Sequence, residues 1–187
     1  MTFNERKAAQ MAAFFLQKSS RLEVLKLMKL LYLADRLAMD LYDTPISGDR
    51  MVSMPHGPVL SQTLDLMNGS RPDPDQGWQS WISDREAYQV GLAPERTQST
   101  SEDLTALSDA EIDVLGKVWA EFGHVGKYHL VDYTHDCCAE WKDPHGSSSP
   151  ITYEDIFLAL GRDAVSAREA AELLESQDTV DRLFASL

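Results

Sequence analysis

The chain has 187 residues and a formal net charge of −13. One domain with an appendage fits this length better than two independent domains. The negative charge repels phosphate backbones and anionic lipid, so nucleic acid and membrane surfaces are poor candidates for partners, whereas a basic protein suits it. No apolar run approaches the roughly 20 residues of a membrane span, and the N-terminus lacks the layout of a secretory signal. We therefore expect a cytoplasmic protein.

Helix starts are marked by a Ser or Thr that precedes an acidic side chain by three positions. This arrangement satisfies the free backbone N–H groups of the first helical turn. The pairs are Thr2–Glu5, Ser20–Glu23, Ser108–Glu111, Thr152–Asp155 and Ser166–Glu169. Each pair predicts a helix, and we expect the third helix to end at Gly123 and the fourth near Gly161.

Residues 26–42, which follow Ser20, are apolar on almost every side. Their leucine and methionine side chains cover more than the arc of roughly 100° that a surface helix uses, so this helix is predicted to lie at the centre of the fold. Lys26 and Lys29 share one narrow polar strip near its start. Two interpretations are open for them: a solvated edge whose stems cover apolar surface, or contact with a partner.

After the central helix, the sequence predicts a turn and a short strand at residues 51–54. Pro58 is predicted to open the next helix, because the N–H that proline lacks is not needed at that position. We expect this helix to end at Asn68 and Gly69. Further along, the alternation of Tyr88, Val90 and Leu92 indicates a half-buried hairpin strand.

The predicted fold is therefore mainly α: a compact helical domain around a buried central helix, with a small antiparallel β-hairpin or sheet. Residues 94–103 are polar and form either a linker or a surface loop. We expect residues 1–160 to be the domain and residues 161–187 to be a helical extension. The extension packs either on the domain or on another chain, which includes the alternative of a homodimer.

Three motifs resemble, in their order and spacing, the Panacea domain, also called the SocA-like antitoxin or phage-associated GepA family. The first motif is KLMKLLY at residues 26–32, and the second is HGPV at residues 56–59. The third lies within LVDYTHDCCAEW and includes Leu130, Thr134, His135 and Trp141. The resemblance covers roughly residues 10–160. His56 stands where the family usually has an aromatic residue, and Glu140 where it often has proline, which we expect to affect partner choice more than fold.

The resemblance implies a helical domain that acts as an antitoxin and neutralises, by direct contact, a protein toxin encoded beside it. One relative is an adaptor that presents its toxin to a protease, so delivery to a protease is an alternative function. The residues predicted to bind the partner are Lys29, Tyr32, His56, Pro58, His135 and Trp141. Core packing is the alternative interpretation for Tyr32 and Trp141, and His56, in a turn, is expected to be the most exposed.

Histidine and cysteine residues gather between positions 124 and 145, the richest cluster for a metal site or an enzyme. The adjacent Cys137 and Cys138 cannot readily bind one metal together, and His124 and His129, five positions apart, would not face the same side of a single helix. A cysteine hydrolase would need contact between one of these thiols and a base such as His135, which nearness in sequence does not establish. We therefore predict two reduced thiols, no metal, no cofactor and no enzymatic activity.

A DNA-binding regulator is a further, less favoured alternative, because small helical domains with a hairpin can be winged helices. A recognition helix should be basic. The candidate segment PVLSQTLDLMNG has no positive charge, and DAEIDVLGKVWAEF has one lysine against several acids. We therefore expect no nucleic-acid partner.

Overall fold

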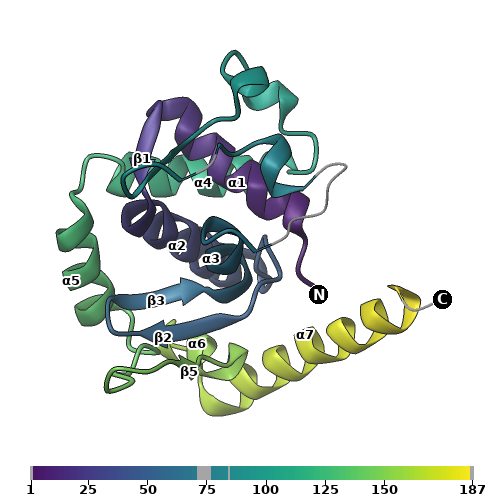
Figure 1. Ribbon diagram of the computed structural model, residues 1–187. Coiled ribbons are helices and arrows are strands. Elements are labelled where there is room, and N and C mark those ends of the chain that lie inside the picture. Colours follow the sequence, from purple (N-terminus) through teal and green to yellow (C-terminus); the bar gives the residue numbers. More distant parts are fainter. Residues whose placement is uncertain (1, 71–76, 84, 186–187) are drawn as a thin grey trace.

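The computed structural model describes residues 2–70, 77–83 and 85–185. The described chain is mainly helical, with two small antiparallel sheets (Figure 1), which confirms the predicted fold class. The helices are α1 (Glu5–Lys18), α2 (Val24–Tyr42), α3 (Ser61–Met67), α4 (Asp109–Phe122), α5 (Lys127–Cys137), α6 (Tyr153–Ala159) and α7 (Ala164–Ala185). The strands are β1 (Arg21–Glu23), β2 (Met51–Met54), β3 (Gly57–Leu60), β4 (Gln89–Gly91) and β5 (Ser149–Pro150). Short 3-10 helices are η1 (Trp78–Ser80), η2 (Pro94–Arg96) and η3 (Ser101–Asp103). No helix in the described ranges has the length and apolar character needed to cross a membrane.

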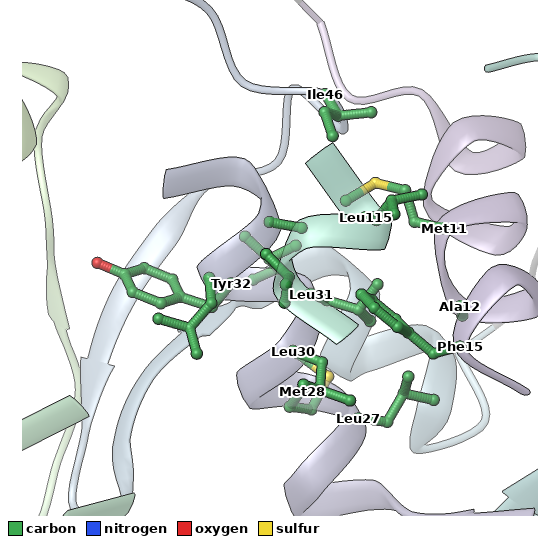
Figure 2. Packing of buried hydrophobic residues seen from close by; sticks show 14 of the residues in the cluster. Met11, Ala12, Phe15, Leu27, Met28, Leu30, Leu31, Tyr32, Ile46 and Leu115 are labelled. Atoms are coloured by element: carbon green, nitrogen blue, oxygen red, sulfur yellow. The ribbon is translucent and has the colours of Figure 1, made fainter. Parts of the chain in front are cut away.

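Helix α2 lies at the centre of the fold, as predicted, with α1, α4, α5 and the β2–β3 hairpin around it (Figure 1). Leu27, Leu30 and Leu31 are completely buried. Figure 2 shows Phe15 of α1 and Leu115 of α4 packed into the same cluster. Burial of a side chain of this size is worth roughly 1.5–3 kcal/mol, so contacts on α2 supply much of the apolar stabilisation.

The two sheets are positioned by antiparallel pairing. In the first sheet, Met51 lies opposite Leu60 and Met54 opposite Gly57, which leaves Pro55 and His56 at the tip of the β2–β3 hairpin, while β5 pairs with the other edge of β2. Strand β3 is buried along its whole length and packs on α2 and α5. In the second sheet, β1 pairs with β4, and α2 begins directly after β1.

Two of the five predicted helix starts are confirmed with their capping boxes, at Ser108 and Thr152. The other three are wrong in detail. The side chain of Asn4 caps α1 in place of Thr2, and the carboxylate of Asp163 caps α7 in place of Ser166. Ser20 precedes a strand, because pairing with β4 holds Arg21–Glu23 extended and delays the start of α2.

The prediction that Pro58 opens a helix is also wrong, because Pro58 lies within β3 and α3 begins only at Ser61. Strand β3 forms the edge of its sheet, where a proline is tolerated. The predicted strand at residues 51–54, the end of α3 at Asn68 and the end of α4 at Gly123 are confirmed.

Candidate functional site

The three sequence motifs, far apart in the chain, meet where α2, the β2–β3 hairpin and α5 join. Lys29 of α2 is fully buried, and its Nζ donates a hydrogen bond to the backbone carbonyl of Pro58 at 2.7 Å. Gly57 has a φ of +91°, and a Cβ on it would lie 2.6 Å from Thr134 Oγ1 and 2.9 Å from Lys29 Nζ. Only glycine fits here, because both the backbone conformation and the space exclude a side chain.

Glu140 forms the second part of this junction. Its buried carboxylate accepts hydrogen bonds from the Tyr32 hydroxyl at 2.5 Å and from Arg36 Nε at 2.6 Å. Burial and the nearby carboxylate raise the pKa of Tyr32 well above its ordinary value, so the phenol stays protonated and can donate. These contacts tie the chain after α5 to the central helix.

The third part is an aromatic stack. The rings of His135 and Trp141 lie 3.8 Å apart at 14°, and Trp141 Nε1 donates to the carbonyl of Met54 at 3.0 Å. This bond holds the end of β2 beside α5. We call the whole set the motif cluster, and its members are Lys29, Tyr32, Gly57, Pro58, Thr134, His135, Glu140 and Trp141.

Burial sets the electrostatics of the motif cluster and of the thiol beside it. It lowers the pKa of Lys29 to about 7 and raises the pKa of Cys138 to about 12. The pKa of His135 is also lowered, by burial and by the nearby Lys29. Cys138 therefore stays a thiol at neutral pH, and a thiol is a weak nucleophile. Within the part of the chain that the structure describes, no group of three or more His, Cys, Asp or Glu residues could hold a metal ion.

The six predicted partner-binding residues differ in their exposure. Lys29, Tyr32 and Pro58 are buried, and His135 and Trp141 are half-buried against each other. His56 is exposed at the hairpin tip. The interpretation of Lys29 as part of a solvated strip is wrong, because its ammonium group points at the carbonyl of Pro58. Lys26 is half-buried and donates to the carbonyl of Gly123 at 2.7 Å. Binding of a partner by the six residues remains a prediction.

A groove of about 1000 Å³ adjoins the motif cluster. Buried Met28 and Val59, with half-buried Leu64, supply an apolar floor. Its rim is aromatic and polar: His56 comes from the hairpin tip, and Tyr88 and Tyr128, which are 73% and 66% exposed, come from the turn before β4 and the first turn of α5. The sequence did not predict these two tyrosines as binding residues, because neither lies in a recognised motif.

The groove carries less negative charge than the molecule as a whole. Among the described residues that line it, the charged side chains are Glu23, Arg85 and Lys127, in a chain whose net charge is −13. Lys127 forms an ion pair with Glu23, and the guanidinium of Arg85 lies 4.8 Å from the centre of the Tyr88 ring. The groove therefore offers a cationic and aromatic rim above an apolar floor.

The turn that presents Tyr88 is conformationally strained. Glu86 and Gln89 exchange both backbone hydrogen bonds, and the two residues between them have positive φ, +48° for Ala87 and +66° for Tyr88. Such a turn favours Asn-Gly, and a left-handed conformation costs other residues roughly 1–2 kcal/mol each. The carbonyl of Tyr88 also accepts a hydrogen bond from the N–H of Val24. Backbone strain of this kind is concentrated at functional sites.

Comparison with known families agrees with this geometry. The model of the family described as antitoxin SocA-like, Panacea domain, matches residues 27–142, which is more than half of the chain. The chain belongs to the SocA-like antitoxin family. The matched range holds the whole motif cluster of this SocA-like domain, and it ends before α6 and α7. No curated protein and no solved structure matches the chain.

Proposed function

We propose that this SocA-like protein neutralises a protein toxin encoded next to it, in the cytoplasm, by binding the toxin on the groove beside the motif cluster. Family membership supports an antitoxin role. The observation that carries the location is Tyr88, which a strained turn holds exposed above an apolar floor. Tyrosine and arginine are enriched among the residues that dominate binding energy at interfaces, and Arg85 and Tyr128 lie on the same rim.

The motif cluster has a supporting role in this proposal. Lys29 and Thr134 enclose Gly57, and Trp141 holds the end of β2, so the hairpin tip has one fixed position. The backbone of His56 at this tip is thereby fixed before binding, which lowers the conformational entropy lost on binding and favours affinity. Buried residues of the cluster would then affect toxin binding through the position of the tip.

The proposed neutralisation needs no chemical step. The Cys138 thiol is buried and has a raised pKa, and His135 is stacked on Trp141. A contact that blocks the toxin or holds it inactive accounts for an antitoxin role with binding alone. The negative field of the whole chain would speed the encounter with a basic toxin.

The test replaces the strained turn with its preferred sequence. Ala87→Asn with Tyr88→Gly gives the Asn-Gly turn, which should raise the melting temperature because both positive φ values become favourable. The same change removes the exposed ring, and we expect the affinity for the toxin from the neighbouring reading frame to fall at least tenfold, or about 1.4 kcal/mol. Calorimetry and rescue of growth during toxin expression measure the two effects.

Tyr42→Ala is the matched control, because Tyr42 is exposed at the end of α2 and does not line the groove. It should leave neutralisation intact. Full neutralisation by the Asn-Gly variant would place the toxin elsewhere. Faster disappearance of the toxin in cells that contain the antitoxin would instead indicate delivery to a protease.

A further inference from the structure

Helix α7 carries two separate apolar faces. Ala167, Ala171 and Leu174 are buried in the hydrophobic core cluster, and α7 packs against α6. Leu173 and Val180 are 60% and 49% exposed. Successive helical residues are about 100° apart, so the exposed face is not a continuation of the packed one.

The exposed face carries three large apolar side chains on one side of the helix, with the polar Ser176 and Gln177 between the first two. Leu173, Val180 and Phe184 are spaced seven and four residues apart, which places them on one side, and Phe184 is 72% exposed. Figure 1 shows the C-terminal half of α7 extending beyond the body of the domain. We call these three residues the α7 stripe. Large apolar side chains exposed together mark an interaction site more often than single ones do.

The charge of α7 limits what can cover the stripe. The helix has five acidic residues against two arginines in its sequence: Glu169, Glu172, Glu175, Asp178 and Asp181 against Arg168 and Arg182. Two copies of an acidic helix repel each other. The stripe also spans only about two heptads, whereas a coiled coil needs three to four. A second copy of this chain is therefore a poor occupant.

We propose that the α7 stripe binds a basic amphipathic helix of a partner protein. Apolar side chains of that helix would cover Leu173, Val180 and Phe184, and its lysine or arginine side chains would face the exposed carboxylates of Glu169 and Glu172. None of the three stripe residues lines the groove, and α7 lies outside the matched family range. The proposal therefore stands whether or not the groove binds a toxin.

The test uses the full chain and two synthetic helical peptides with leucine at positions i, i+3, i+4 and i+7. One peptide has lysine at its polar positions and the other has glutamate. Fluorescence anisotropy should show binding of the lysine peptide, weakened at least tenfold by high salt because exposed charges are screened. The glutamate peptide should not bind.

A triple variant, Leu173→Gln, Val180→Gln and Phe184→Gln, keeps every charge and a good helix propensity. It should weaken binding of the lysine peptide at least tenfold, with an unchanged helical signal in circular dichroism. The control, Leu41→Ser with Tyr42→Ser, alters exposed apolar residues at the end of α2 and should bind normally.

Three results would overturn the proposal. If the triple variant bound the lysine peptide as tightly as the original chain does, charge alone would account for binding. If the glutamate peptide bound as tightly as the lysine peptide, the partner would not need to be basic. A dimer in light scattering that the triple variant abolishes would make a second copy the occupant.

Discussion

Replacement of Gly57 by alanine tests the motif cluster directly. The φ of Gly57 is +91°, and a Cβ would lie 2.6 Å from Thr134 Oγ1 and 2.9 Å from Lys29 Nζ. Real Cβ atoms do not approach other heavy atoms so closely. The variant must therefore displace the lysine, the threonine or the hairpin itself.

The expected loss follows from three contributions. The left-handed conformation costs alanine roughly 1–2 kcal/mol, and overpacking of a closed site costs roughly 1–3 kcal/mol. Below its pKa of about 7, Lys29 is charged, and its displacement from the carbonyl of Pro58 would then forfeit a charge-assisted hydrogen bond, worth roughly 1.5–3 kcal/mol. Since the last two overlap, we expect the free energy of unfolding to fall by about 3–5 kcal/mol, measured by urea denaturation.

Gly161 supplies the matched control. It has the same φ of +91°, but a Cβ there has no atom within 4 Å, so Gly161→Ala should cost only about 1–2 kcal/mol.

Thr134→Ala removes the atom nearest to the added Cβ. Combined with Gly57→Ala, it should destabilise the protein by less than the sum of the two single variants. Equal losses for Gly57→Ala and Gly161→Ala would refute the close packing that we describe.

Three further predictions concern buried groups of the same region. The pKa of Lys29 is lowered to about 7 in the folded state, so between pH 7 and 10 the unfolded chain binds a proton that the native chain does not. The free energy of unfolding should therefore rise with pH relative to Lys29→Met, by up to about 1.4 kcal/mol per pH unit; parallel curves for the two proteins would contradict this. Glu140→Gln removes the charge that Tyr32 and Arg36 share, and should lower the stability to urea by about 3–5 kcal/mol, whereas a loss below about 1 kcal/mol would show that the contact is weak. Ellman's reagent at pH 8 should react rapidly with one thiol per chain, because Cys137 is exposed and Cys138 is buried; rapid reaction of both would contradict the burial of Cys138.

The central position of α2 was predictable, because its apolar residues leave only a narrow polar strip for solvent. The burial of Lys29 was not, since its acceptor is a carbonyl 29 residues away and a lysine beside apolar residues usually reaches water. Helix α5 escaped prediction because its buried side is small: only Leu130, Val131 and Thr134 are buried. The motifs located the junction, but they did not indicate which of its side chains are exposed.

The groove was harder to anticipate, because its residues come from separate segments of the chain. Tyr88 was predicted as part of an alternating strand. In the structure, Tyr88 is instead the second of the two central residues of a turn, after Ala87. This turn lacks the Asn-Gly that usually marks such turns. The positions of Tyr128 and Arg85 depend on how α5 and the turn pack beside α2, which no local pattern records.

The hydrogen bond from Val24 to the carbonyl of Tyr88 has a consequence for how occupancy of the groove could be observed. It joins the rim to the amide that begins the buried helix, so rim and helix cannot move independently at this point. An occupant that clamps the tyrosine would slow opening of this bond. Hydrogen exchange of the Val24 amide, a backbone group at the start of the buried helix, would then report whether the groove at the surface is occupied.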